Sequence, residues 1–152
     1  MRYKQPLSVL VVVYTRDLDV LLIERADYPG HWQSVTGSVE AGETLARAAV
    51  RELAEETAID AEAFGSVRDW RMTNEFEIFS QWRDRYPPGT THNTEHVFGL
   101  EVPAPIAVVL SPREHLRHVW LPWRDAAARC FSWSNRAAIE TLPQRISTRS
   151  SA

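Results

Sequence analysis

The segment 37–59, GSVEAGETLARAAVRELAEETAI, concentrates acidic side chains at a spacing that suits metal chemistry. Glu52, Glu55 and Glu56 fall within little more than one helical turn, so their carboxylates point into one arc of about 100°. Like charges four residues apart cost about 0.2–0.5 kcal/mol per pair, so local stability does not favour this arrangement. A hard cation such as Mg²⁺, which prefers oxygen ligands and is often completed by substrate phosphates, relieves the repulsion. The segment therefore predicts a divalent metal site.

A helix is expected to position these acids. Thr44 is a suitable N-cap, and an apolar stripe borders the acidic arc, formed by Leu45, Ala46, Ala49, Val50 and Leu53. This pattern places the acids at the rim of a cleft. Arg51 lies one turn before Glu55 and either holds the Glu55 carboxylate in place or forms an ordinary surface ion pair, worth at most about 1 kcal/mol. The alternative for the whole segment is an amphipathic surface helix with solvated acids.

The spacing in this segment matches a known pattern. Gly37, five residues, Glu43, seven residues and then Arg51-Glu52-Leu53-x-Glu55-Glu56 resemble the signature of the Nudix hydrolases. The resemblance implies an enzyme that cleaves a nucleoside diphosphate linked to another moiety, with divalent metal held by the helix glutamates. One position departs from the family, which usually has glycine where this chain has Ala58. A left-handed helix exit at Ala58 would cost about 1 kcal/mol.

The resemblance also assigns roles to the acids. It implies that Glu52 and Glu56 hold Mg²⁺, with Mn²⁺ as a possible substitute, and that Glu114 adds one further carboxylate from a later loop. Glu55 is then the general base or another metal ligand, oriented by Arg51. The glutamates are also able to share these duties.

Four residues are expected to contact the phosphates of a substrate. Lys4 and Arg25 stand just outside apolar strand segments, where cations either neutralise a polyphosphate or serve ordinary solubility. The hydroxyl of Thr36, at the mouth of the signature loop, either bonds a phosphate or closes the turn. Ser132 precedes a predicted helix, so it either helps to hold an anion or simply caps that helix.

Segments outside the signature, from about residue 6 to residue 142, narrow the resemblance. WQSVTGSVEAGET, FEIFSQWRDRYPPGTTHNTEHVF, the turn at Glu114-His115-Leu116 and FSWSNRAAIE resemble the dihydroneopterin triphosphate pyrophosphohydrolases of bacterial folate synthesis. This implies Mg²⁺-dependent cleavage to the monophosphate and pyrophosphate. The alternatives are a housecleaning nucleoside triphosphate pyrophosphohydrolase and a non-catalytic Nudix-fold module that binds a ligand. The residues that hold the pterin ring are not assigned.

Composition limits the other function classes. The 152 residues suit one domain, expected at 1–143, with a disordered polar tail at 144–152. A net charge of −3 without a basic tract argues against binding a nucleic acid polymer. The absence of a long apolar run argues against a membrane span. The single Cys130 fits a small buried hydrophobe in a reducing cytoplasm. A monomer acting on a small-molecule triphosphate is expected.

Hydrophobic patterns predict an α+β fold. The expected strands are residues 7–14, 20–25, 32–36, 64–72, 75–86, 95–102, 106–110 and 117–121, and the expected helices begin near Thr44 and span 122–131 and 134–142. The segments 75–86 and 95–102 are predicted to form a long antiparallel hairpin. Such an order suggests a mixed sheet between helical layers, which the resemblance makes a Nudix α/β/α sandwich.

Overall fold

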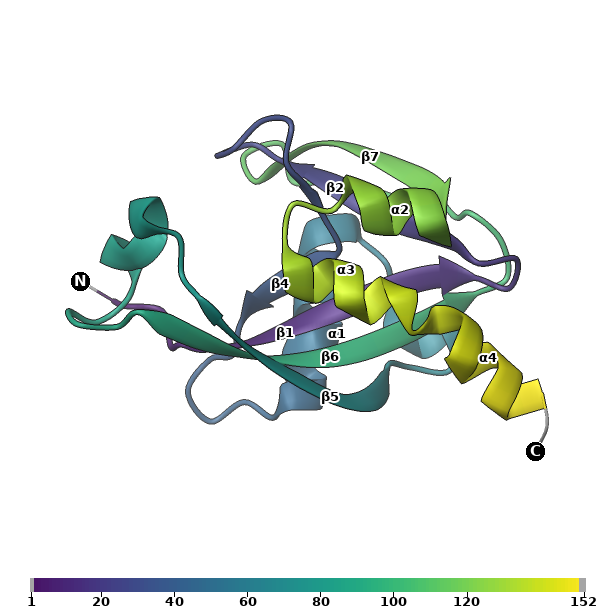
Figure 1. Ribbon diagram of the computed structural model, residues 1–152, viewed down its shortest axis with the longest axis horizontal. Coiled ribbons are helices and arrows are strands. Elements are labelled where there is room, and N and C mark those ends of the chain that lie inside the picture. Colours follow the sequence, from purple (N-terminus) through teal and green to yellow (C-terminus); the bar gives the residue numbers. More distant parts are fainter. Residues whose placement is uncertain (1, 151–152) are drawn as a thin grey trace.

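The computed structural model describes residues 2–150 of the chain, with side chains up to residue 146. The strands are β1 (Leu7–Thr15), β2 (Asp19–Arg25), β3 (Trp32–Gln33), β4 (Val35–Ser38), β5 (Arg68–Glu77), β6 (His92–Val102) and β7 (His115–Pro122). The helices are α1 (Leu45–Thr57), α2 (Trp123–Arg129), α3 (Trp133–Glu140) and α4 (Leu142–Ser150), with short 3₁₀ turns η1 (Ala61–Phe64) and η2 (Ser80–Arg85) (Figure 1). None of the helices in this described part is long and apolar enough to cross a bilayer.

The strands form one mixed sheet that splits around β1. The order is β3-β2-β1-β6-β5, with β4 added to β1 and β7 added to β2. Strand β1 runs parallel to β6 and antiparallel to β4, whereas β1 and β2 share only the pair Tyr14↔Val20. Because β1 and β2 diverge from that pair, the sheet opens toward the N-terminal end of β1.

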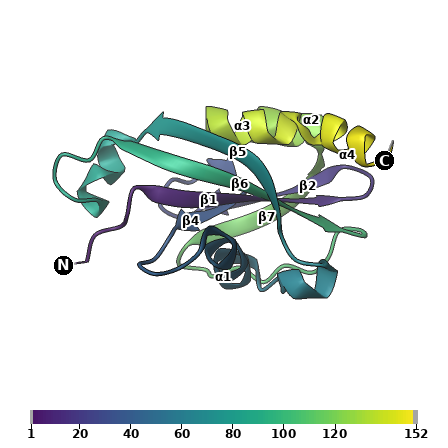
Figure 2. The same cartoon turned by 90° about the horizontal axis from the view of Figure 1, so that it is seen from below.

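Helices cover both faces of this sheet (Figure 2). On one face, Val9, Val11 and Val13 of β1 pack with Ala49 and Leu53 of α1. The alternate β1 residues, among them Leu10 and Val12, pack on the other face with α2, α3 and α4. This period of two explains the continuous apolar run of β1, since both faces of a central strand are covered. The predicted sandwich with a mixed sheet is confirmed.

Helix α1 begins and ends as its residues predict. The Thr44 hydroxyl accepts a hydrogen bond from the backbone N–H of Arg47, 3.1 Å away, as an N-cap does. Ala58 ends the helix in the left-handed region at φ 61°, and its N–H donates to the carbonyl of Ala54. The chain therefore makes the left-handed exit with alanine, at a steric cost that glycine would avoid.

Three predicted elements differ in the structure. Strand β5 already ends at Glu77, and residues 80–85 form η2, because Phe79 and Trp82 turn away to stack on each other. Residues 106–110 do not form a strand: their alternating apolar side chains pack on the core, but the Val109 N–H bonds the Thr57 carbonyl at the end of α1. The hairpin partner of β6 is β5 rather than residues 75–86: the paired residues run from Glu77↔His92 to Arg68↔Gly99, with a bulge between Asp69 and Met72.

The C-terminal region also differs from expectation. Helix α3 begins at Trp133 with Ser132 as its N-cap, one residue earlier than predicted. Helix α4 covers residues 142–150, where a disordered tail is predicted, and the Arg145 guanidinium donates to the Trp70 carbonyl. Residues 151–152 lie outside the described part of the chain. Cys130 is buried in the α2–α3 side of the core, as predicted.

Candidate active site

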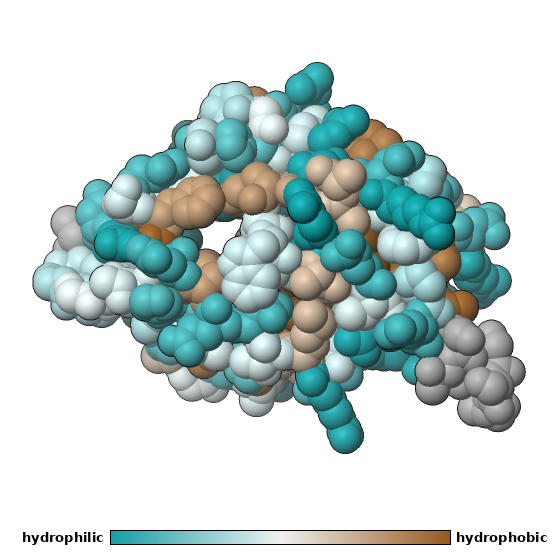
Figure 3. Space-filling view, in the orientation of Figure 1, coloured by the Kyte–Doolittle hydropathy of each residue, from teal (hydrophilic) through white to brown (hydrophobic). Residues whose placement is uncertain are grey.

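A pocket of about 1010 Å³ opens where the sheet splits, and Figure 3 shows the molecule hollowed at this place. The structure brings all nine predicted site residues to this one pocket: Lys4, Arg25, Thr36, Arg51, Glu52, Glu55, Glu56, Glu114 and Ser132. They come from segments far apart in the chain. Their side chains differ in what they contact, so each part of the pocket has its own chemistry.

The acids of α1 form the first part. Glu52 and Glu56 face each other, and Glu56 is almost fully buried, at 2% exposure. Glu52 lies directly over Gly37 of β4, where an added Cβ would overlap its carboxylate. Gly37 is therefore required by close packing between β4 and α1, since its own φ is not positive.

Arg51 fixes three of the acids. Its guanidinium donates two hydrogen bonds to Glu43, of 2.7 and 2.9 Å, and one of 2.8 Å to Glu52. A further bond of 3.0 Å reaches the Ser38 carbonyl of β4. Its contact with Glu55 is longer, at 3.3 Å. The predicted Arg51–Glu55 pair is therefore the longest of these hydrogen bonds, and Glu43 is the main partner of the arginine.

Burial changes the proton affinity of this cluster. The pKa of Glu56 is raised well above its usual value, first by burial and then by the neighbouring charges of Glu52 and Glu114. The Nε2 atom of His115 lies 3.4 Å from Glu56 Oε1, but burial lowers the pKa of His115 to about 4, so this imidazole is neutral at pH 7. Oε2 of Glu56 has no hydrogen-bond partner in the described residues. A buried acid without a counter-charge is thus left in the pocket.

The donor set fits a divalent cation in its chemistry. Carboxylate oxygens are the ligands that hard cations prefer, and the unpartnered Oε2 of Glu56 is an oxygen in need of one. Across the described residues, however, no three acidic, histidine or cysteine side chains converge as a ready-made metal centre. Arg51 draws Glu52 and Glu55 toward itself, which explains why the acids do not converge.

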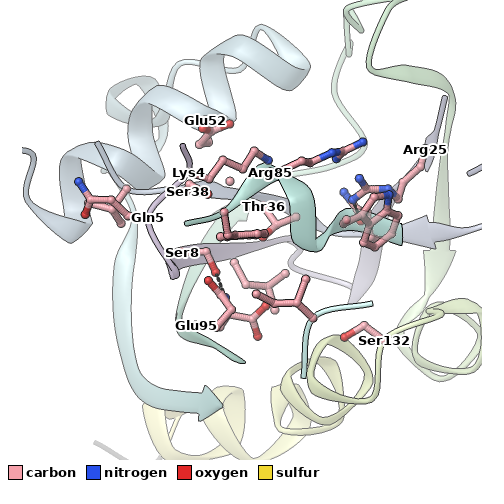
Figure 4. A pocket seen from close by; sticks show the side chains of 18 of the residues that line it. Lys4, Gln5, Ser8, Arg25, Thr36, Ser38, Glu52, Arg85, Glu95 and Ser132 are labelled. Atoms are coloured by element: carbon pink, nitrogen blue, oxygen red, sulfur yellow. Dashed lines mark hydrogen bonds between the residues drawn. The ribbon is translucent and has the colours of Figure 1, made fainter. Parts of the chain in front are cut away.

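Cations gather beside the acids, as Figure 4 shows for Lys4, Arg85 and Arg25. Burial and the two nearby arginines lower the pKa of Lys4. Arg25 is not free, because it donates two hydrogen bonds to Asp27 and lies 4.2 Å over the ring of Trp82. Arg85 donates a third hydrogen bond to Asp27, 3.0 Å long, and Arg25 together with Arg85 lowers the pKa of Asp27 to about 2, so Asp27 is ionised.

The two hydroxyls predicted to contact phosphate have protein partners. Thr36 donates to the Val9 carbonyl of β1, 2.9 Å away, and so ties β4 to the sheet. Ser132 accepts a long hydrogen bond from the Asn135 N–H, 3.4 Å away, as the N-cap of α3. Both hydroxyls line the pocket and retain an acceptor lone pair.

The opposite side of the pocket is a polar floor on β6. Glu95 is 4% exposed, and Asn93, two residues before it, is 2% exposed. The Asn93 amide donates to the Ser8 hydroxyl, 2.7 Å away. Burial raises the pKa of Glu95 to about 7, although the Ser134 and Asn74 side chains act against this. In Figure 4, Glu95 and Ser8 lie across the pocket from Glu52 and Lys4.

Comparison with known proteins identifies the family of this chain. A profile of the NUDIX domain matches residues 4–142. The chain belongs to the Nudix family. Nudix hydrolases generally need divalent metal ions, which agrees with the acids of α1.

Individual Nudix relatives cover almost the whole chain. The dihydroneopterin triphosphate diphosphatase of Escherichia coli K12 is 51% identical over 91% of this chain and 92% of its own. The enzyme of that name from Haemophilus influenzae is 43% identical over 92% of this chain and 89% of its own. The solved structure of the E. coli dihydroneopterin triphosphate pyrophosphohydrolase superposes with a TM-score of 0.87, covering 93% of this chain and 97% of that one, at 50% identity. The predicted Nudix hydrolase fold is confirmed by this match.

Sequence analysis missed several lining residues of this Nudix pocket. Glu95 sits in an alternating strand segment and gives no local signal, and Arg85 and Trp82 fall in a segment predicted as strand. His115 appears only as part of a resembling turn. The one available signal is the two-residue period of a strand. Asn93, Glu95 and Val97 lie on the same face of β6, so two polar residues share the face of a core valine.

Proposed function

We propose that this Nudix hydrolase cleaves dihydroneopterin triphosphate to dihydroneopterin monophosphate and pyrophosphate, with Mg²⁺ as its cofactor. One observation carries the proposal: identity of 51% to the E. coli enzyme runs over 91% of the chain. The matched region is therefore far longer than the acidic helix alone. The nine residues named from the sequence line this same pocket.

The acids of α1 have the first role in the mechanism. Glu52, Glu56 and Glu114 are the residues that would hold Mg²⁺, whose charge polarises phosphoryl oxygens and lowers the pKa of water. Arg51 keeps Glu52 oriented through a 2.8 Å hydrogen bond, while Glu43 anchors Arg51 from the other side. Glu55 is half exposed at the pocket rim, where its carboxylate is able to accept a proton from the attacking water.

The remaining residues bind the triphosphate. Lys4 and Arg25 supply positive charge, and Arg85 joins them on the same side of the pocket. Thr36 and Ser132 offer hydroxyl groups to phosphate oxygens, in addition to their bonds within the protein. Cations and hydroxyls on several elements orient one linkage of the triphosphate toward the acids.

The proposal predicts a substrate order. With Mg²⁺, kcat/KM for dihydroneopterin triphosphate should exceed that for each common nucleoside triphosphate, because the E. coli relative that matches 91% of this chain is named for that substrate. A steady-state panel measures this. A nucleotide with a kcat/KM tenfold or more above that of dihydroneopterin triphosphate would contradict the pterin substrate and indicate a nucleoside triphosphate pyrophosphohydrolase. Absence of all turnover would instead favour a ligand-binding module.

The same reaction followed by phosphorus NMR identifies the bond that is cut. Cleavage at one internal linkage releases pyrophosphate without an early burst of orthophosphate. Stepwise release of single phosphates contradicts the proposed reaction. Replacing Mg²⁺ with Mn²⁺ in parallel samples shows which cation the acids of α1 use.

A further inference from the structure

The floor of the pocket contains two buried acceptors without donors. Oε1 of Glu95 and Oδ1 of Asn93 have no hydrogen-bond partner in the described residues, and neither does the buried donor Nδ2 of Asn74 on the neighbouring strand β5. Both side chains line the pocket. An unpaired buried acceptor costs about 1–3 kcal/mol, so two of them on one strand need an explanation.

The register of the sheet places these acceptors together. Asn93 and Glu95 stand two residues apart on β6, so both point to the face of the sheet that carries α3. Ser8 of β1 lies opposite Glu95 on one side, and Asn74 of β5 lies opposite it on the other. The Ser8 hydroxyl accepts a hydrogen bond from the Asn93 amide, which fixes the Asn93 side chain, and it retains its own O–H donor.

The Glu95 carboxylate on the floor also has no cationic side chain among the groups that act on its pKa. In residues 2–146, Arg and Lys side chains approach the acids of α1 and Asp27, whereas the groups that set the proton affinity of Glu95 are neutral, namely Ser134 and Asn74. A phosphate would be repelled by such a floor. A ligand group that presents two adjacent N–H donors would satisfy it.

We propose that Glu95, supported by Asn93, binds the edge of a 2-amino-4-oxopyrimidine ring, accepting hydrogen bonds from the ring N–H and the neighbouring amino group. Pterins and guanine share this edge. The inference takes its substrate from the proposed function, and it adds the residue that recognises the heterocyclic ring by hydrogen bonding. In its ionised form the Glu95 carboxylate accepts stronger hydrogen bonds than a neutral acceptor does, so the contact selects as well as binds.

The position of Glu95 suits this role. Glu95 lies across the pocket from Glu52, Lys4 and Arg85, so a ring on the floor leaves the triphosphate free to extend toward the acids and cations (Figure 4). Phe76 lies opposite Asn93 on β5 and also lines the pocket, which provides an apolar surface beside the polar edge. A planar heterocycle needs both features.

GTP and ITP test the contact directly, because they differ only in the 2-amino group. The parent enzyme with Mg²⁺ should show a kcat/KM for GTP at least tenfold above that for ITP. A site that accepts a hydrogen bond from the 2-amino group of the ligand discriminates against an analogue that lacks this group. A parent ratio within twofold overturns the inference, whatever any variant does.

Glu95→Gln tests the residue. The amide presents one donor against the ring N–H, so the GTP to ITP ratio should fall below threefold. KM for dihydroneopterin triphosphate should rise at least tenfold, with kcat within threefold, since the contact binds the ring rather than the reacting phosphate. Glu75→Gln is the matched control, because Glu75 is an exposed acid on neighbouring β5, and it should keep the parent ratio.

The outcomes separate this inference from the proposed function. If the enzyme does not turn over dihydroneopterin triphosphate, the proposed substrate is wrong. The Glu95 contact is still supported if the enzyme prefers GTP tenfold over ITP and Glu95→Gln abolishes this preference. Turnover of dihydroneopterin triphosphate with an unchanged KM and nucleotide ratio in a folded Glu95→Gln enzyme overturns the contact and leaves the function standing. If Glu95→Gln does not fold, Glu95→Asp replaces it, with loss of the ratio expected and an intact ratio contradicting the contact.

Discussion

Glu56 illustrates how one residue is suited to chemistry rather than stability. Its carboxyl is buried against Glu52 and a neutral His115, and its pKa is raised. Burying such an acid without a cation costs free energy, because burial penalises the charged form. The residue therefore weakens the isolated protein at neutral pH, and its proposed role is to bind a cation that enters the pocket.

Glu56→Gln should consequently reduce turnover and leave the fold intact. Glutamine keeps the size and helix propensity and removes a charge that repels Glu52, so the Tm without metal should stay level or rise. Activity should fall by about 10²–10³ or more, as for loss of a preorganised electrostatic contact. Thermal melts with and without Mg²⁺, beside steady-state rates, measure both effects.

The Mg²⁺-dependent rise in Tm should shrink in the same variant, because a ligand stabilises only through the native state that it binds. Glu140→Gln, at an exposed position on α3, is the matched control and should behave as the parent. Unfolding of Glu56→Gln, or turnover within threefold of the parent, would show that the acid is structural.

Predictability at the level of residues depends on how local the arrangement is. Glu52 and Glu56 could be read from the sequence because a single helix sets their spacing. The main partner of Arg51 could not, since Glu43 reaches it from the loop before the helix. Glu95 was missed because its neighbours come from β1, β5 and α3, and strand register is a property of the whole sheet.

At the level of elements, the close contact of β4 with α1 depends on the absence of a side chain at Gly37. Gly37 allows the Glu52 carboxylate to rest on the strand. Gly99 of β6 plays the same steric part for the ring of Trp70, away from the pocket. The two glycines therefore form a natural pair for separating effects on catalysis from effects on packing.

Gly37→Ala should displace Glu52 and reduce kcat by at least tenfold, because Glu52 is a proposed metal ligand and small displacements of such a group are costly. Gly99→Ala should lower the Tm through its clash with Trp70 while keeping kcat within threefold. Urea melts and steady-state rates on both variants check this. Equal kcat in Gly37→Ala and the parent would mean that Glu52 does not need its position over β4.

Strands and helices with strong periodicity could be predicted, whereas two segments could not. Residues 75–86 alternate well enough for a strand, but tertiary stacking of Phe79 on Trp82 overrides that preference. Residues 106–110 have the right pattern and lack a neighbouring strand, since Val109 bonds the end of α1. Periodicity reports which side chains are buried, and it does not report where the backbone finds its hydrogen bonds.

For the molecule as a whole, Glu95 links stability to pH. Its pKa in the folded protein is raised to about 7 from 4.5, so the folded state holds its proton more tightly than the unfolded state does. The stabilisation from this proton is complete below about pH 4.5 and is lost as pH rises through about 7. His115 acts in the opposite direction, because its lowered pKa makes the protein lose stability as pH falls through about 6.5 toward about 4.

Comparing Glu95→Gln with the parent isolates the first contribution, since His115 is present in both. The variant should gain stability relative to the parent as pH rises from 5 to 8, by at most about 3 kcal/mol. Urea unfolding without metal at four pH values measures the difference. Glu75→Gln should show no such trend. A constant difference from pH 5 to pH 8 would contradict the raised pKa.

The split sheet also bears on how this protein can change over generations. Glu52 and Glu56 approach the pocket from the face that carries α1, whereas Glu95 and Asn93 approach it from the face that carries α3. Each group packs against its own half of the core. On the inferred Glu95 contact, substitutions on β6 are expected to change which heterocycle binds while the acids of α1 keep their own packing, so specificity for the ring and affinity for the phosphates can change separately over generations.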